Sequence, residues 1–362
     1  MKKFMVCSGF LGSGKTTTMM ALQQHYSGSY GKAAMISNDL GAKGLVDYRF
    51  SASQGCASTE IAGGCICHVT EDLVDRLRRL FNDEENDLVM SDIPGFGVGA
   101  MEQVYIKLEE TYPGEFDLAP FLVVTEPKVL RTLMGEKADT LLPDEMKVLL
   151  DAQLKEADII ALNKIDTIDG EEEQHLRGFL ERTYPDRPVF SISALQGLGL
   201  DALIDYISSH GARLQKADFG YEQPAFDAAF GKLSEYNAQY YSKVCCDDFD
   251  ANAYLQDLAR AVAAQLQQHQ RTTPHLKIFG QTEDGQVAMI NLTGVNQPIS
   301  TDSRIDHPCI DLPVVINTTS ACEPDLLAAI MQSSIQQVSD AYNLSVVMFY
   351  TECFGLRDEG RI

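Results

Sequence analysis

The sequence lacks any long apolar run and is short of positive charge. No window approaches the roughly 18 consecutive apolar residues that a membrane-spanning helix needs, although 45% of the 362 residues are hydrophobic. Lysine and arginine total 29 against 52 aspartates and glutamates, which gives a formal net charge of −23. A surface of that sign repels phosphate backbones. We therefore expect a globular protein with neither a membrane nor a nucleic acid as partner.

We expect no targeting segment, and the sequence shows neither an internal repeat nor a low-complexity tract. Only eight residues precede Gly9, the first residue of a phosphate-binding motif, and a cleaved signal peptide would have to include that motif. The expected location is therefore the cytoplasm. Nine cysteines in a reducing compartment are expected to be free thiols, so their clustering is more informative than their number.

A phosphate-binding loop occupies residues 9–16, which read Gly-Phe-Leu-Gly-Ser-Gly-Lys-Thr directly behind the apolar run 4–7. Its glycines let the backbone curl so that successive N–H groups face one phosphate at a helix N-terminus. Lys15 is expected to reach the β- and γ-phosphates of a nucleotide, and the Thr16 hydroxyl to bind Mg²⁺. The residues expected to hold the nucleotide here are Gly9, Gly12, Ser13, Gly14, Lys15, Thr16 and Thr17.

Short apolar runs alternate with amphipathic helical patterns over residues 1–212, which is typical of a parallel sheet wrapped by helices. We therefore expect a phosphate-loop NTPase domain of the α/β class, with a mostly parallel sheet and the ligand at the carboxyl ends of the strands. The expected strands span 4–7, 33–37, 88–91, 121–124, 159–162 and 189–192.

A second domain is expected over residues 213–362, behind a segment at 211–224 that shows no clear period. Its elements follow in the order β-α-β-β-(β)-α-β, which predicts a smaller ferredoxin-like α+β domain. The expected helices span 251–270 and 324–341, and the expected strands 241–245, 276–279, 287–292, 314–317 and 345–350.

The strand expected over 88–91 runs into Ser-Asp-Ile-Pro-Gly, which gives Asp92 and Gly95 the D-x-x-G spacing. In phosphate-loop hydrolases such an aspartate holds Mg²⁺, usually through water, and the glycine N–H bonds the γ-phosphate. The alternative is an Asp-x-Pro-Gly turn without a function. Because a phosphate loop precedes the motif, we assign Asp92 and Gly95 to catalysis together with Lys15 and Thr16.

A third motif, Asn-Lys-Ile-Asp at 163–166, follows the apolar run 159–162. The Asp166 carboxylate can accept hydrogen bonds from N1–H and the exocyclic amine of guanine, which adenine does not offer. Behind the next strand, a backbone N–H at 193–194 can meet the guanine carbonyl oxygen. The order of the motifs therefore predicts GTP and GDP as ligands. The base-binding residues are expected to be Asn163, Lys164, Asp166, Ser193 and Ala194.

A fourth motif, Gly-Gly-Cys-Ile-Cys-His, places Cys65, Cys67 and His68 within four residues. Two thiolates and an imidazole suit Zn²⁺ or a similar transition metal, and the preceding glycines let the loop bend both sulfurs inward. Cys56, separated from Cys65 by eight residues, is a candidate fourth ligand. The alternative is a buried loop with two packed thiols and a histidine in solvent.

Together the four motifs resemble those of the CobW-type GTPases, relatives of the nickel-enzyme maturation factors UreG and HypB. Those proteins have a similar phosphate loop, a Gly-Gly-Cys-x-Cys-Cys metal motif, an acidic-x-x-Gly strand end and an Asn-Lys-x-Asp motif. The segment Ser-Asn-Asp-Leu-Gly at 37–41, with Asp47 further on, is similar to the Asn-Glu-Phe-Gly switch segment of that family. The resemblance covers about residues 1–210.

The resemblance implies that Cys65 and Cys67 are metal ligands in a loop linked to the nucleotide switch regions, with zinc, cobalt or nickel as the metal. It makes Asp39 a carboxylate near that metal or near Mg²⁺. It implies a GTPase that delivers a transition metal or a metal cofactor to a client metalloprotein, for which the second domain is a binding site.

Several positions depart from the family pattern. His68 occupies the place of the third cysteine, which changes the metal preference, and Ala42 replaces a carboxylate. The C-terminal part has no histidine-rich tract. Phe96 stands where some GTPases place a water-orienting glutamine, so we expect slow turnover that a homodimer, the metal or the client accelerates.

Three other functions stay open at this point. The first is a GTPase switch that assists assembly of a corrinoid or other metalloenzyme without binding metal itself. The second is a small-molecule kinase, which the guanine motif at 163–166 disfavours. The third is a binding module with a degraded nucleotide site, which the presence of Lys15, Thr16 and Asp92 disfavours.

Overall fold

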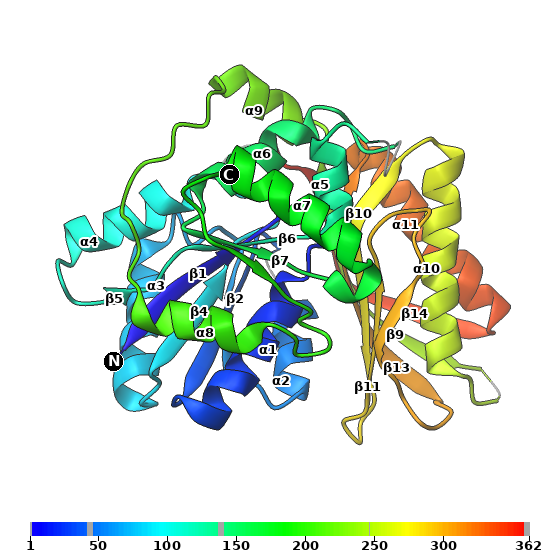
Figure 1. Ribbon diagram of the computed structural model, residues 1–362. Coiled ribbons are helices and arrows are strands. Elements are labelled where there is room, and N and C mark those ends of the chain that lie inside the picture. Colours follow the sequence, from blue (N-terminus) through cyan, green and yellow to red (C-terminus); the bar gives the residue numbers. More distant parts are fainter. Residues whose placement is uncertain (1, 42–45, 137–140, 246, 358–362) are drawn as a thin grey trace. The chain divides into compact units, whose positions relative to one another are not determined.

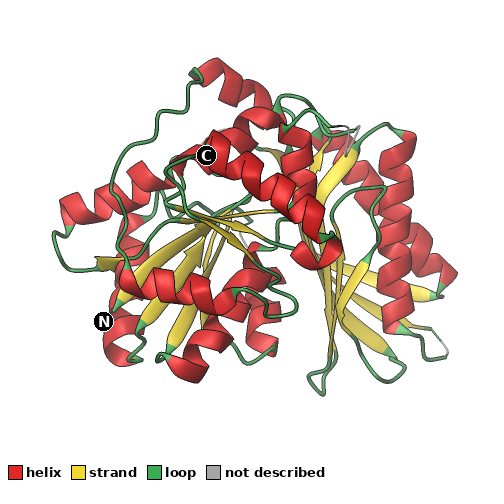
Figure 2. Ribbon diagram, in the orientation of Figure 1, coloured by secondary structure: helices red, strands yellow, loops and turns green. Residues whose placement is uncertain are grey.

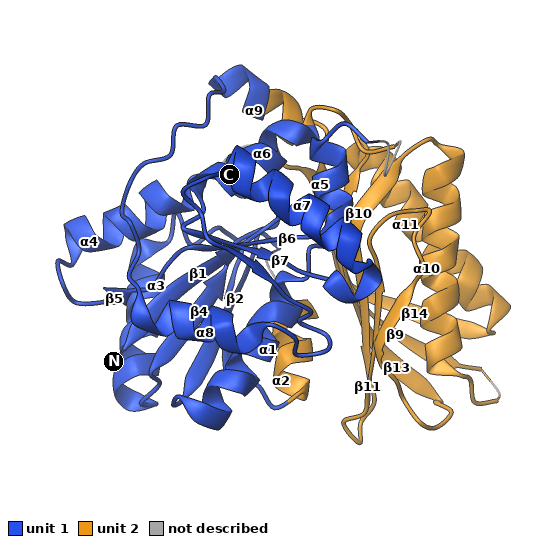
Figure 3. Ribbon diagram, in the orientation of Figure 1, with its two compact units in different colours: residues 1–42, 55–138, 146–226 blue, residues 43–54, 139–145, 227–362 orange. Residues whose placement is uncertain are grey.

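The computed structural model describes residues 2–41, 46–136, 141–245 and 247–357 (Figure 1). The chain forms two compact units (Figure 3). The expected boundary at 212 lies inside the first unit, and the second unit takes up two short segments from the N-terminal half. The first unit comprises residues 1–42, 55–138 and 146–226, and the second 43–54, 139–145 and 227–362.

A parallel sheet forms the centre of the first unit, and all six expected strands belong to it. Strands β3 and β5 were not expected; β5 pairs with β1 beside the main path. Along the sheet the order is β3-β2-β4-β1-β6-β7-β8, and every pairing is parallel. The strands are β1 (Lys3–Ser8), β2 (Ala33–Asp39), β3 (Ser58–Ala62), β4 (Leu88–Asp92), β5 (Asp117–Leu118), β6 (Leu122–Thr125), β7 (Ile159–Leu162) and β8 (Val189–Ser191).

Helices alternate with these strands along the chain, which confirms the α/β class (Figure 2). The central strands are buried along their whole length, because helices cover such a sheet on both faces. The helices of the first unit are α1 (Lys15–Ser29), α3 (Thr70–Arg78), α4 (Lys107–Thr111), α5 (Pro127–Leu133), α6 (Met146–Glu156), α7 (Gly170–Thr183) and α8 (Leu200–Ser209), and α9 (Gln223–Phe230) spans its end.

An antiparallel sheet forms the second unit, in the order β12-β11-β10-β13-β9-β14. Four of its strands and both helices give the expected β-α-β-β-α-β pattern, in which β13 lies between β9 and β10. The hairpin of β11 and β12 extends this sheet. The elements are β9 (Ser234–Val244), α10 (Ala251–Gln268), β10 (Thr272–Gln281), β11 (Val287–Leu292), β12 (Ser300–Ser303), β13 (Asp311–Ala321), α11 (Pro324–Ala341) and β14 (Leu344–Gly355).

Apolar side chains are packed on both faces of the second sheet. One face carries the main core with α10 and α11, to which Ile278 and Ile290 belong. Side chains alternate along strands, so their neighbours Phe279 and Met289 point to the other face. There they pack against Val46 of α2 (Val46–Ser53), a helix encoded between β2 and β3. The sequence did not predict that this helix packs on the second sheet.

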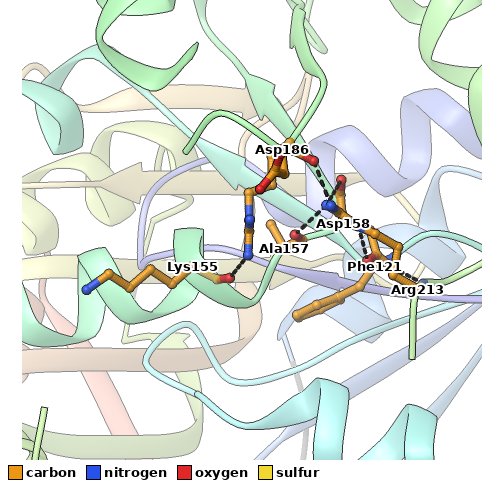
Figure 4. Close-up of polar contacts among 7 residues, drawn as sticks. Phe121, Lys155, Ala157, Asp158, Asp186 and Arg213 are labelled. Atoms are coloured by element: carbon orange, nitrogen blue, oxygen red, sulfur yellow. Dashed lines mark hydrogen bonds and ion pairs between the residues drawn. The ribbon is translucent and has the colours of Figure 1, made fainter. Parts of the chain in front are cut away.

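The segment behind α8, for which no period was visible, is bound to the first unit (Figure 4). The Arg213 guanidinium donates to the Asp158 carboxylate at 3.1 Å and to the carbonyl oxygens of Ala157, Asp158 and Asp186. Asp158 also accepts the backbone N–H of Phe121 at 2.9 Å. Within the described residues, no helix is both long and apolar enough to cross a membrane.

Candidate nucleotide site and thiol loop

The predicted motifs meet at the carboxyl ends of the parallel strands. The phosphate loop follows β1, Asp92 ends the adjacent strand β4, and Asn163 follows β7. The pairing register sets Cys7 of β1 opposite both Asp92 and Leu122 of β6. The topology therefore brings Asp92 and the phosphate loop together, as expected for such sheets.

Glycine is required at two points of the phosphate loop. A Cβ on Gly9, whose φ is 141°, would lie 2.1 Å from the carbonyl oxygen of Val124. A Cβ on Gly14, whose φ is 92°, would lie 2.4 Å from Asn163 Nδ2. Gly14 precedes α1 and has no side chain to cap it, and the N-terminus of a helix favours a bound phosphate. The loop therefore fits a nucleotide phosphate.

The D-x-x-G glycine lies against the phosphate loop. A Cβ on Gly95 would come within 2.7 Å of Leu11 Cδ2 and 2.9 Å of Lys15 Nζ, so a larger residue would displace these two side chains of the phosphate loop. Lys15 Nζ donates to the carbonyl oxygen of Gly9 at 2.9 Å. The residues assigned to phosphate binding and to hydrolysis thus share one site.

The guanine motif is hydrogen-bonded to the phosphate loop. Asn163 Nδ2 donates to the carbonyl oxygen of Ser13 at 3.0 Å, and Lys164 Nζ donates to that of Gly12 at 2.7 Å. The Asp166 side chain is exposed, so it is open to a base. Glu126, which the sequence analysis missed, accepts a 2.7 Å bond from Lys164 and fixes that side chain.

The backbone at 193–194 is engaged within the protein. The N–H of Ser193 donates to the carbonyl oxygen of Leu198 at 3.1 Å, and that of Ala194 donates to Asn163 Oδ1 at 3.0 Å. The first bond lies within the loop behind β8, and the second ties this loop to the guanine motif. A direct contact of Ser193 or Ala194 with the base stays a prediction.

Cys65 and Cys67 come together on the loop between β3 and α3, residues 63–69, which we call the thiol loop. Their Sγ atoms are 2.9 Å apart, and both side chains are buried. The two thiols are hydrogen-bonded to each other, and this bond lowers the pKa of Cys65, while the same bond and burial raise the pKa of Cys67. The His68 N–H donates to the carbonyl oxygen of Cys65 at 2.9 Å, which closes a turn. Such a pair of thiols fits a soft or borderline cation such as zinc.

The other expected metal ligands do not complete this pair. The His68 side chain is exposed and Cys56 is half-buried. Over residues 2–41, 46–136, 141–245 and 247–357, no group of three or more His, Cys, Asp or Glu side chains is arranged to hold a metal. The roles of His68, Cys56 and Asp39 stay predictions, and Ala42 lies outside the described residues.

The comparison with known sequences agrees with these motifs. Residues 3–191 match the sequence model described as "CobW/HypB/UreG, nucleotide-binding domain". The chain belongs to this family. It is 32% identical over 182 residues to the zinc chaperone YeiR of Escherichia coli (strain K12), a match that covers 50% of this chain and 52% of YeiR. It is 25% identical over 254 residues to the zinc chaperone CobW of Sinorhizobium sp, covering 62% and 70%.

The chain thus spans about half the length of YeiR. Among solved structures, the hydrogenase maturation factor HypB from Archaeoglobus fulgidus is 17% identical. That match covers 57% of this chain and 89% of HypB, with a TM-score of 0.37.

In this CobW/HypB/UreG domain, α6 holds the loop behind Gly95, which the sequence analysis missed. Gln153 Nε2 donates to the carbonyl oxygens of Gly95 at 3.2 Å and Gly97 at 3.0 Å. One turn later, the Glu156 carboxylate accepts the N–H of Gly99 at 2.9 Å. Burial raises the pKa of Glu156 to about 8, although backbone hydrogen bonds oppose the shift. Two side chains on one helix face therefore anchor the loop at residues 95–99.

Proposed function

We propose that the protein is a GTP hydrolase whose nucleotide state times the binding and delivery of a transition metal, with zinc as the first candidate. The observation that carries the metal half is the 2.9 Å separation of two buried thiols, Cys65 and Cys67, in a nucleotide-binding domain of this family. The names of YeiR and CobW as zinc chaperones support the choice of zinc.

The nucleotide half rests on the residues at the strand ends. In the proposal, the N–H groups of loop 9–16 and Lys15 hold the phosphates of GTP or GDP, while Thr16 and Asp92 hold Mg²⁺. A bound Mg²⁺ supplies positive charge to the γ-phosphate. The exposed Asp166 carboxylate accepts the two donors of guanine, which sets the preference for GTP over ATP.

Slow turnover is part of the proposal. Phe96 follows the D-x-x-G glycine and is buried, so it offers no polar group to orient an attacking water. Turnover would then rise only when a homodimer, the metal or the client adds the missing group. We place the protein in the cytoplasm and expect a client metalloprotein as the receiver of zinc or of a cobalt- or nickel-containing cofactor.

The test is zinc affinity of the reduced full chain with a GTP analogue and Mg²⁺, with GDP and Mg²⁺, and without nucleotide. Tight zinc binding that depends on the nucleotide is expected. It should be lost in the double variant Cys65→Ser with Cys67→Ser and kept in Cys322→Ser, a matched variant of a buried thiol in the second unit. Equal affinity in all three nucleotide states would make the site a storage or structural site.

A second function is a GTPase switch that assists metalloenzyme assembly without binding metal. The observation that favours it is the lack of a third His, Cys, Asp or Glu side chain beside the thiol pair among the residues that the structure describes. Zinc titration that is unchanged in the double cysteine variant would support this switch and contradict the metal-delivery function.

A further inference from the structure

Asn38 lies between Asp92, the residue assigned to Mg²⁺, and the thiol loop. It belongs to β2, which pairs on one side with β4 and on the other with β3. Asp92 ends β4, and the thiol loop follows β3. The Asn38 side chain is only 4% exposed, so its amide group needs partners within the protein.

The backbone of Asn38 bonds to Asp92, at the proposed nucleotide site. Its N–H donates to Asp92 Oδ1 at 2.6 Å. The carboxylate assigned to Mg²⁺ is thereby oriented by the end of β2. A shift of Asp92 toward or away from a bound ion must lengthen this bond or move Asn38 with it.

The side chain of Asn38 bonds to the backbone of the thiol loop. Its Nδ2 donates to the carbonyl oxygens of Gly64 at 2.7 Å and Ile61 at 3.1 Å, and its Oδ1 accepts the N–H of Ile66 at 3.1 Å. Gly64 and Ile66 are the two neighbours of Cys65, so one amide group fixes the backbone on both sides of that thiol. Both donors of the amide are used.

We propose that Asn38 is a positioning residue that couples the nucleotide to the thiol pair, by linking the Asp92 carboxylate to the backbone around Cys65. This inference rests on the proposed function, because it needs both ligands to bind. Only asparagine fits all the bonds of its side chain. Aspartate has the acceptor but no donor for Gly64 and Ile61, and alanine leaves buried groups of the loop without partners.

The chain offers a matched control for a purely structural role. Gln23 is also a buried amide, and its Nε2 also donates to two carbonyl oxygens, those of Ala33 at 2.8 Å and Ala57 at 3.1 Å. These lie at the opposite ends of β2 and β3 from Asn38 and the thiol loop. Gln23→Ala therefore removes a similar set of bonds without touching the link between Asp92 and Cys65.

The experiment measures the zinc dissociation constant of the full-length reduced protein by competition with a chelating dye, with and without a GTP analogue and Mg²⁺. The ratio of the two constants is the coupling factor, which we expect to be about 5 to 150 in the wild type. Asn38→Ala and Asn38→Asp should bring it to within about twofold of unity, while Gln23→Ala keeps the wild-type factor. A wild-type factor in folded Asn38→Ala or Asn38→Asp overturns the proposal.

A measurement on the wild type avoids variants that fail to fold. Hydrogen exchange of the Ile66 N–H, which donates to Asn38, should change at least severalfold when the GTP analogue and Mg²⁺ are added without zinc. An unchanged rate overturns the proposal. Failure of the proposed function looks different: zinc does not bind to the wild type, or its affinity is the same in all nucleotide states.

Discussion

Gln153 donates its side-chain amide to the carbonyl oxygen of Gly95, the glycine of the D-x-x-G motif, across 58 positions of sequence. The same amide reaches Gly97 at 3.0 Å, so a single side chain fixes two carbonyl groups of the loop. This side chain is buried, and water cannot easily replace it. The position of Gly95, whose N–H is expected to face the γ-phosphate, therefore depends in part on α6.

Gln153→Ala should slow GTP hydrolysis. The loop loses two hydrogen bonds, each worth about 1 kcal/mol, so we expect a kcat lower by roughly tenfold with a smaller change in KM. Steady-state phosphate release measures both constants. Gln265→Ala, which removes an amide bonded to Ser334 in the second unit, is the control and should leave kcat unchanged. A wild-type kcat in Gln153→Ala would show that the loop is held by other contacts.

Glu156 should make stability depend on pH. Its pKa of about 8 in the folded protein lies above the usual value, so the folded state favours the protonated carboxyl. Its contribution is complete below about pH 4.5 and is lost as the pH rises to about 8, at up to about 1.4 kcal/mol per pH unit. Urea unfolding of zinc-free wild type and Glu156→Gln between pH 5 and 9 measures this slope as a difference.

The expected result is a free energy of unfolding that falls with pH more steeply in the wild type than in Glu156→Gln. Glutamine keeps an acceptor for the Gly99 N–H and has nearly the size of glutamate, but it cannot ionise. A difference between the two curves therefore reports the ionisation and not a change of packing. Parallel curves over the whole range would mean that Glu156 titrates with an ordinary pKa.

Asp158→Ala should destabilise the first unit strongly. The carboxylate is nearly buried and bonds to Arg213 and to the Phe121 N–H, as Figure 4 shows, so its loss leaves the Phe121 N–H without an acceptor. Arg213 is partly exposed and keeps its bonds to carbonyl oxygens, so we expect a loss of about 2 to 3 kcal/mol in the free energy of unfolding. Glu181→Ala, which breaks a solvent-exposed pair with Arg177, should cost less than about 1 kcal/mol. Similar losses in the two variants would contradict this account.

Asp166→Ala should weaken GTP binding far more than ATP binding. Guanine loses its acceptor for two N–H donors, whereas adenine never used it, so we expect a loss of roughly a hundredfold or more for GTP alone. Competition between a fluorescent GDP analogue and each nucleotide measures the two affinities. Asp169→Ala, which removes the cap that accepts the Glu172 N–H, controls for a local effect on α7. Equal losses for GTP and ATP would remove the guanine assignment.

The sequence predicted those strands whose burial shows in the chain itself. Strands β1, β6 and β7 each contain a run of apolar residues because both of their faces are covered. The edge strand β3 alternates buried and less buried residues, and β12 reads Ser-Thr-Asp-Ser, so neither stands out as an apolar run. These strands form through pairing with a neighbour, which no local pattern records.

The residues of the candidate site also fall into two groups, those that a local motif predicts and those that it does not. Lys15, Asp92 and Asp166 could be predicted because each lies in a short motif whose spacing carries the chemistry. Asn38 and Gln153 could not, because their partners are 54 and 58 positions away. A buried amide in a sequence gives no sign of what it binds. Its role becomes visible only when the sheet and α6 bring those partners together.

Helix α2 also has a consequence for the order in which the protein forms during synthesis. Asp47 of this helix pairs with Lys277 of β10, 230 positions later, and its Val46 packs on the same sheet. At about 5 to 20 residues per second, the ribosome makes α2 many seconds before the strands that bury it. Until those strands are made, the apolar side of α2 stays exposed to solvent. A nascent chain that pauses before β10 would therefore be a natural substrate for chaperones.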